Sequence, residues 1–289
     1  MNNEERKQLL LKMLAKKKQE SKAEVAEQIV ASHKEVFPLS MVQRGIWLDC
    51  QMDPDSVVYN IPFACKIKGA INIEALKEGI RRIISRHDIW RTVLVQKEED
   101  VFQKILPEME LDFRFYDKRK QNYTDELVAE EAKAFVSERF DVKNGPHVRF
   151  ALYQTEENVY YFILSGHHIV YDGTSENLFC QELSEEYSAA LNQQTSSISD
   201  PSISYGDYAE FVLAKMESEA IKSQIEYWKQ ELSGIEPTEF PTDFPRPTIR
   251  RSEGGMIYFD IPKDIEKKVR QYAQSHHVTM NVVLHAALI

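Results

Sequence analysis

Hydrophobic positions along this chain follow the two periods that distinguish strands from helices. The stretch from Val159 to Leu164 is apolar without interruption and rich in β-branched and aromatic residues, as is typical of a central strand covered on both faces. Between Ser175 and Leu191 the apolar residues recur at helical spacing, and Thr174 or Ser175 is expected to cap that helix. A short turn therefore joins a buried strand to a helix.

The same two patterns predict the remaining elements. Strands are expected over residues 57–68, 90–96, 101–105, 148–154 and 256–261. Helices are expected over residues 72–85, 125–140, 205–232, 263–275 and 279–289. Ser40, with Gln43 three residues later, predicts a capping box at the start of a further helix. Because helices and strands alternate, we expect a layered α/β (α+β) fold.

The chain is expected to form three parts. Residues 1–34 carry an apolar stripe among lysines and arginines, which predicts an amphipathic, basic leader helix. Residues 35–204 form a first lobe that contains most of the predicted strands. Residues 192–204, rich in Ser and Gln, are expected to connect this lobe flexibly to residues 205–289, which begin with a bridging helix. The leader helix either packs loosely on the domain or docks to an acidic partner.

Composition and charge exclude several classes of protein. The net charge of −10 at pH 7 opposes binding to nucleic acid. No apolar run is long enough to span a membrane, and the N-terminus has no hydrophobic signal segment. Cys50, Cys65 and Cys180 lack the spacing of a metal or redox site and indicate free thiols in a reducing compartment. We therefore expect a soluble, cytoplasmic protein.

Chemistry is expected in the turn between the buried strand and the helix, where His167, His168, Asp172 and Gly173 lie. Adjacent residues of an extended chain point to opposite faces, so one histidine should face the packed interior and the other an opening. Asp172 should be partly buried beside the strand, and a buried carboxylate needs a cationic partner. Gly173 lets the backbone turn tightly and lets a ligand approach the helix N-terminus.

Two other interpretations apply to this turn. A histidine at a strand end is commonly a core residue with satisfied hydrogen bonds. Two histidines that diverge and a single aspartate do not make a complete ligand set, so no metal is expected. The complete string of two histidines, three further residues, aspartate and glycine favours a reactive site.

Four segments resemble signatures of the condensation domains of nonribosomal peptide synthetases, within the chloramphenicol acetyltransferase-like superfamily. The turn from His167 to Gly173 resembles the HHxxxDG signature. Residues 38–47, 86–92 and 205–209 are similar to S-x-A-Q-x-R-x-W, R-H-[DE]-x-L-R-T and Y-x-D-[FY]-A, respectively. Thr174 stands where the family usually has a bulky residue. The other positions that depart from these patterns are Val42, Gly45 and Trp90.

The resemblance implies a fold and a reaction. The fold would be a chloramphenicol acetyltransferase-like lobe, complete in its N-terminal part and followed by the start of a second lobe. The reaction would form an amide, because the amine of an acceptor aminoacyl thioester attacks the carbonyl of a donor acyl or peptidyl thioester. Phosphopantetheine arms of carrier proteins, beside adjoining synthetase modules, would bring both substrates, and no cofactor would be bound. With the second lobe incomplete, the isolated chain is expected to be weakly active or inactive.

Within this reaction the two histidines and the glycine would have different roles. His168 would face the site and either accept the ammonium proton or donate a hydrogen bond to the tetrahedral intermediate, since imidazole ordinarily titrates near pH 6.5. His167 would be structural. The Gly173 N–H could donate to the developing oxyanion.

The resemblance also implies support for the site. Arg86, in the second segment, would pair with Asp172, with Arg91 as the second choice, because an unpaired buried carboxylate would become protonated or distort the loop. Thr174 and Ser175, next to the signature, would contact the substrate.

Other functions remain open at this point. Another acyltransferase of the superfamily would transfer an acyl group from coenzyme A or a carrier to an alcohol or amine, and an epimerisation-type domain would also keep the paired histidines. A non-catalytic domain would only recruit partners. Such domains usually lose the signature, which is intact here.

Overall fold

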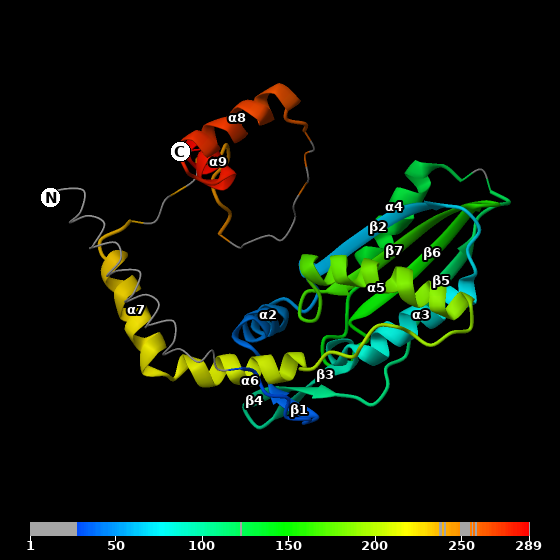
Figure 1. Cartoon of the computed structure of the whole chain (residues 1–289), viewed down its shortest axis with the longest axis horizontal. Coiled ribbons are helices and arrows are strands. Elements are labelled where there is room, and N and C mark those ends of the chain that lie inside the picture. The colour runs from blue at the N-terminus through cyan, green and yellow to red at the C-terminus, as the bar shows by residue number, and fades with distance from the viewer. Residues whose placement is uncertain are drawn as a thin grey trace, which may run out of the picture. The chain divides into compact units, whose positions relative to one another are not determined.

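In the computed structural model, the long apolar run forms strand β7 (Val159–His167), an inner strand of a four-stranded sheet (Figure 1). β2 (Asn60–Lys68) and β6 (Val148–Glu156) pair with it in antiparallel fashion, so the predicted hairpin between β6 and β7 is confirmed. β5 (Asp112–Asp117) lies parallel to β6 at the edge. This edge strand was not predicted, because its apolar residues are interrupted by charged ones over only a few positions.

The structure describes residues 28–288 apart from residues 122, 237–238, 240, 249–254, 256 and 258. Most of the predicted leader helix lies outside the described residues, and residues 28–34 have no regular secondary structure. The chain divides into two compact units between residues 238 and 239. This division differs from the predicted boundary after residue 204, because helix α6 (Tyr205–Met216) packs against β1 (Val36–Pro38) of the first unit.

Helices cover both faces of the four-stranded sheet. Side chains of α3 (Ile73–Arg86) and α5 (Gly173–Leu191) form the main core with one face. α4 (Asp125–Val136) covers the other face and ends earlier than predicted. The prediction that β7 is covered on both faces is thus confirmed, which explains its unbroken apolar sequence.

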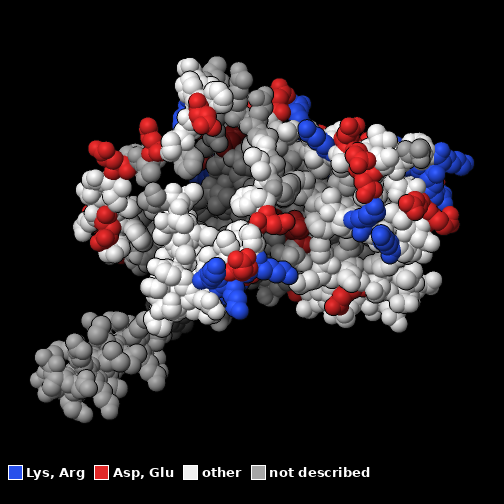
Figure 2. Space-filling model, turned by 90° about the horizontal axis from the view of Figure 1, so that it is seen from above, with Lys and Arg blue, Asp and Glu red and all other residues white. Residues whose placement is uncertain are grey.

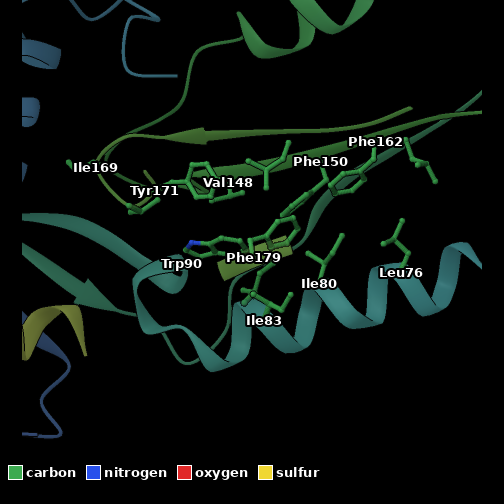
Figure 3. Close-up of a cluster of buried hydrophobic side chains, with 14 of the residues drawn as sticks. Leu76, Ile80, Ile83, Trp90, Val148, Phe150, Phe162, Ile169, Tyr171 and Phe179 are labelled. Atoms are coloured by element: carbon green, nitrogen blue, oxygen red, sulfur yellow. The ribbon is translucent and has the colours of Figure 1, made fainter. Parts of the chain in front are cut away.

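Aromatic rings fill the main core between the sheet and the two helices (Figure 3). Phe162 of β7 stacks on Phe179 of α5 with ring centroids 6.2 Å apart, and Phe150 of β6 lies 5.8 Å from the same ring. Trp90 lies 5.5 Å from Phe179 and closes the end of the core nearest the His167–Gly173 turn. These rings hold α5, whose N-terminus follows the turn, firmly against the sheet.

A second, three-stranded antiparallel sheet has the strand order β1–β4–β3. β3 (Thr92–Lys97) and β4 (Asp100–Ile105) form the predicted hairpin. A short 3-10 helix, η1 (Asp88–Arg91), connects α3 to β3 and takes up the first residues predicted as strand. Helix α2 (Met41–Met52) follows β1, and Ser40 forms the predicted capping box with Gln43.

The predicted single helix over residues 205–232 is wrong. The chain forms two helices, α6 and α7 (Glu219–Glu231). Ser218 between them has extended backbone angles, and its side chain accepts a hydrogen bond from the Ile221 N–H. Serine is among the strongest N-cap residues, so it starts a new helix where the apolar spacing alone suggests continuation.

The second unit contains α8 (Lys263–Ser275) and α9 (Met280–Leu288), which pack on each other and agree with two predicted helices. Thr279 caps α9, since its hydroxyl accepts a hydrogen bond from Val282 N at 3.3 Å. The strand predicted over residues 256–261 is wrong for its described residues, which form no strand. A strand forms only against a neighbour, and the described part of this unit supplies none.

Charged side chains of both signs lie close together on the face shown in Figure 2. At the protein surface Arg119 pairs with Asp117 at 2.7 Å, and Lys66 pairs with Asp125 at 3.1 Å. Each exposed pair contributes little to stability, but the mixing avoids a large field of one sign.

Asp207 ties the beginning of the described chain to α6. One carboxylate oxygen accepts hydrogen bonds from the N–H and hydroxyl of Ser32 at 2.9 and 2.8 Å, and the other accepts two from Ser204 at 2.8 Å. The neighbouring Gly206 lies against Phe37, whose ring would be 2.3 Å from a Cβ at this position. Burial alone would raise the pKa of Asp207, but the bonds from Ser204 and Ser32 lower it.

We therefore expect Asp207→Ala to lower the free energy of unfolding by about 2–3 kcal/mol at pH 7, since charge-assisted hydrogen bonds to a buried group are lost. Because the pKa is lowered by folding, this contribution is complete above about pH 4 and disappears as the pH falls further. Urea unfolding at pH 7 and pH 3 measures both effects. An equal difference between parent and variant at the two pH values would contradict this assignment.

Candidate functional site

The two adjacent histidines lie on opposite sides of the chain at the end of β7. His167 is the last residue of the strand and only 4% of it is exposed, whereas His168 is exposed. The prediction that one histidine faces the interior and the other faces outward is confirmed in this respect. The alternation of an extended chain is the cause.

His168 is held by backbone atoms on both sides. Its N–H donates to the Tyr59 carbonyl at 2.8 Å, and its Nδ1 lies 3.0 Å from the Tyr171 carbonyl. A carbonyl only accepts hydrogen bonds, so Nδ1 carries the proton when the ring is neutral. The lone pair is then on Nε2. The exposed ring therefore presents a base of defined tautomer.

His167 has the opposite tautomer. Its Nδ1 accepts a hydrogen bond from Ile169 N at 3.3 Å, so the proton is on Nε2, which points at Cys50 Sγ 3.8 Å away. Burial, and then the neighbouring His147, His168 and Arg149, lower the pKa of His167 to about 3. The ring is therefore neutral at pH 7, and its structural role remains a prediction.

The contact between Cys50 and His167 does not form a nucleophilic pair. Burial and the nearby Asp49 raise the pKa of the Cys50 thiol, which keeps it protonated. A nucleophilic cysteine needs a thiolate and a base that accepts its proton, and the neutral, weakly basic His167 supplies neither.

The prediction that Asp172 is partly buried and paired with a cation is wrong. Asp172 is exposed and is the N-cap of α5. Its Oδ1 accepts hydrogen bonds from the Ser175 N–H at 2.8 Å and the Ser175 hydroxyl at 2.7 Å. These bonds lower the pKa of Asp172. The helix N-terminus and solvent stabilise its charge, so no cation is required, and the cap is not Thr174 or Ser175 as predicted.

Arg86 instead pairs with two buried glutamates of α5. Its guanidinium donates to Glu182 at 3.1 Å, to Glu186, and to the Ser196 hydroxyl at 3.1 Å. Burial alone would lower the pKa of Arg86, but the bonds to Glu186 and Glu182 raise it. His87 also contacts Glu182 at 2.9 Å. This cluster, which we call the Arg86 cluster, joins the end of α3 to the middle of α5.

Arg91 does not reach Asp172 either. It pairs with Asp88 and donates to the Leu106 carbonyl. The partners of Arg86 were not predicted, although the sequence holds a signal. Phe179, Glu182 and Glu186 lie on one face of a helix. Because Phe179 is buried, the two glutamates on the same face are buried too, and buried carboxylates need a cation.

The N-terminus of α5 is open beside the histidine turn. Gly173 is the first residue of the helix, and a Cβ there would meet no atom within 4 Å. The positive end of the helix dipole favours negative charge at this end, and the Asp172 carboxylate already accepts the hydrogen bond from the Ser175 N–H. Thr174 is exposed, while Ser175 is engaged with Asp172. Their predicted contact with substrate remains a prediction.

The part of the chain that the structure describes has neither a metal-ligand cluster nor a membrane-spanning helix. Its residues bring together no group of three or more histidine, cysteine or acidic side chains that could hold a metal ion. None of its helices is both long and apolar enough to cross a membrane. Cys50, Cys65 and Cys180 are free thiols.

Comparison with known proteins places these features in a family. The family model "Condensation domain" matches residues 33–289. Chondramide synthase cmdD of Chondromyces crocatus is 31% identical over 264 residues, which cover 88% of this chain and 7% of the synthase. Malpinin synthetase of Mortierella alpina is 32% identical over 252 residues, or 87% of this chain and 3% of that synthetase. The chain therefore spans a small part of these relatives.

Solved structures share the fold. The complex of the X-domain and OxyB from teicoplanin biosynthesis matches with a TM-score of 0.76 and 22% identity, over 88% of this chain and 56% of the matched chain. The starter condensation domain of rhizomide synthetase RzmA matches with a TM-score of 0.64 and 23% identity, over 70% and 48%. The predicted fold class, a layered α/β fold like that of condensation domains, is confirmed.

The Arg86 cluster and the Asp172 cap are expected to differ in their contribution to stability. Arg86→Met removes the cation that two buried glutamates share, leaving Glu186 with the 3.7 Å pair to Arg82 and Glu182 with His87, and should cost about 3–5 kcal/mol. Asp172→Ala removes one helix cap and should cost about 1 kcal/mol. Arg81→Met, on the same helix with a half-exposed 3.5 Å pair to Glu78, is the control and should cost under about 1 kcal/mol. Urea unfolding measures all three, and equal costs for Arg86 and Asp172 would contradict the assignment.

The buried His167 should make the protein sensitive to acid. Between its ordinary value of 6.5 and about 3 the unfolded chain binds a proton that the folded chain does not, so stability falls as pH decreases. Each such histidine contributes up to about 1.4 kcal/mol per pH unit, and the buried His147, whose pKa burial also lowers, adds its own share. In His167→Asn, the slope of the unfolding free energy against pH between pH 6 and 4.5 should be smaller. The decrease should correspond to the uptake of one fewer proton on unfolding. An unchanged slope would show that His167 is protonated in the folded protein.

Proposed function

This chain belongs to the condensation domain family, and we propose that it catalyses amide formation between two thioesters, with His168 as the residue that handles the proton. The observation that supports this most directly is the state of His168. It is exposed, its Nδ1 is committed to the Tyr171 carbonyl, and its Nε2 is left with a lone pair. The full HHxxxDG string from His167 to Gly173 surrounds it.

The chemistry needs one proton transfer and the exchange of one bond. The acceptor amine forms a C–N bond to the donor carbonyl while His168 Nε2 takes the proton that the nitrogen loses. The tetrahedral intermediate then collapses, the C–S bond breaks, and the leaving thiolate takes from His168 the proton that the nitrogen lost. Because a thioester is already activated, most of the acceleration comes from orientation, which supplies on the order of 7–11 kcal/mol in well-aligned reactions.

The open N-terminus of α5 provides the electrostatic part. The Gly173 N–H at the first helical position donates to the negative oxygen of the intermediate, and open space beside Gly173, where a Cβ would meet no atom within 4 Å, supports this role. The Asp172 cap fixes this end of the helix. Asp172 therefore serves the reaction by ordering the turn, not by meeting substrate.

The substrates are proposed to arrive on carrier proteins. The relatives named above are synthases of which this chain matches one segment, which supports donor and acceptor arms of phosphopantetheine and adjoining synthetase modules as partners. The three free thiols support a reducing compartment and therefore the cytoplasm. A docking role for residues 1–34 stays a prediction, and residues 1–27 lie outside the described part.

His168→Ala is expected to reduce product formation by about a hundredfold or more, the usual range for a general acid–base group, with little change in melting temperature because the side chain is exposed. His276→Ala is the matched control, since it is also an exposed imidazole whose Nδ1 lies 3.0 Å from a tyrosine carbonyl. Because weak activity is expected of the isolated chain, the assay uses the chain in amounts stoichiometric with carrier proteins loaded with donor and acceptor, and product is detected by mass spectrometry.

The same assay with acyl-coenzyme A in place of the loaded donor carrier distinguishes the acyltransferase alternative. Product from the carrier donor alone supports the proposal. Equal loss of activity in His168→Ala and His276→Ala, or product from acyl-coenzyme A alone, would overturn it.

A further inference from the structure

The backbone of the histidine turn is held at Ile169 from two directions. The Ile169 N–H donates to His167 Nδ1 at 3.3 Å, and its carbonyl accepts a hydrogen bond from the Gln43 side-chain amide at 3.2 Å. Ile169 is the residue directly after His168 and is only 3% exposed. The amide of Gln43, on α2, therefore contacts the turn one peptide unit from the exposed imidazole.

Gln43 is itself held in one orientation. Its Oε1 accepts a hydrogen bond from Ser40 N at 3.0 Å, so the Nε2 end of the amide must face Ile169. The Gln43 N–H donates to the Ser40 hydroxyl at 3.2 Å, and that hydroxyl lies 3.0 Å from the Tyr205 hydroxyl. Ser40 and Gln43 are 4% and 2% exposed, so water does not compete for these bonds.

These bonds form a chain of contacts from Tyr205 on α6, through Ser40, the N-cap of α2, and Gln43 in α2, to the turn that carries His168. We propose that Gln43 is a positioning residue that fixes this turn so that His168 Nδ1 stays on the Tyr171 carbonyl and Nε2 stays free as the base. The inference rests on the proposed function of His168. It gives the capping box of α2 and Tyr205 a second task beyond starting a helix and filling the core.

The physical reason lies in the tautomer of His168. In water the neutral histidine side chain favours the proton on Nε2, which would leave no lone pair facing outward. The 3.0 Å contact with the Tyr171 carbonyl reverses this preference only while the turn keeps its shape. A turn released at Ile169 loses that contact, and an imidazole displaced by about 1 Å loses up to a hundredfold in rate.

A purely structural role for Gln43 predicts something different. Replacing a buried glutamine leaves backbone groups unsatisfied and lowers stability wherever it lies. Gln103 offers a matched comparison, because it is 1% exposed and its side-chain amide donates to the Pro38 carbonyl at 2.8 Å, in the three-stranded sheet. Gln43→Met and Gln103→Met remove the same groups with little change in volume, and both should lower stability.

The test uses the full chain labelled with 15N-histidine, and the His168 signals are assigned with His168→Asn. The 15N chemical shifts of the ring report which nitrogen carries the proton in the neutral state. Parent and Gln103→Met are expected to show Nδ1–H at His168. Gln43→Met should shift the signals toward the Nε2–H tautomer, and Tyr205→Phe, which removes one hydroxyl at the far end of the chain of contacts, should shift them less.

Turnover is measured alongside with loaded carriers. Gln43→Met should lower kcat about tenfold or more with KM for both carriers unchanged, whereas Gln103→Met should leave kcat within about twofold. Identical His168 tautomers in Gln43→Met and Gln103→Met, both shown to be folded by urea unfolding, would overturn the positioning role. A shifted tautomer with kcat unchanged would leave the positioning intact and count against the proposed function of His168.

Discussion

The burial of β7 on both faces is the constraint on which the rest of the structure depends. Helices α3 and α5 cover one face of its sheet and α4 covers the other, so the strand is apolar from Val159 to Leu164. At that end the alternation of side chains puts His167 into the interior and leaves His168 outside. Burial thus makes the imidazole of His167 a weak base, and the alternation of side chains leaves the imidazole of His168 accessible.

The charged groups near the turn have two roles: the Arg86 cluster places helix α5, and Asp172 orders its first turn. The Arg86 cluster joins α3 to α5 inside the protein, where burying three charges costs about as much as their attraction returns. Its effect is therefore on the placement of α5 more than on net stability. Asp172, at the exposed end of the same helix, orders the first turn through Ser175. One set of contacts places the helix, and the other shapes the end that is proposed to face a substrate.

The sequence predicted much of the fold and the position of the histidine turn between β7 and α5 because both depend on local patterns. Three such patterns are the apolar run of β7, the helical spacing that follows it and the capping box at Ser40. Each of them depends only on residues a few positions apart. The pairing of Arg86 was wrong because it depends on which element packs beside α3, and no local pattern reports that. Asp172 was expected to be partly buried because it follows a core strand, yet the turn carries it to the surface.

Two other differences have equally specific causes. Ser218 interrupts the predicted helix over residues 205–232 because a capping side chain outweighs continuous apolar spacing. β5 was missed because an edge strand needs few apolar residues of its own once β6 supplies a neighbour. In each case a single side chain or a distant partner decided the outcome.

The central claim is that His168 offers an accessible nucleophilic nitrogen to an arriving substrate while His167 does not. Acylation by diethyl pyrocarbonate, followed by peptide mapping, measures this directly in the intact chain. We expect rapid labelling of His168, none of His167, and protection of His168 by a carrier protein loaded with donor thioester. Labelling of His168 that the loaded carrier leaves unchanged, with product formation undiminished after labelling, would contradict the account.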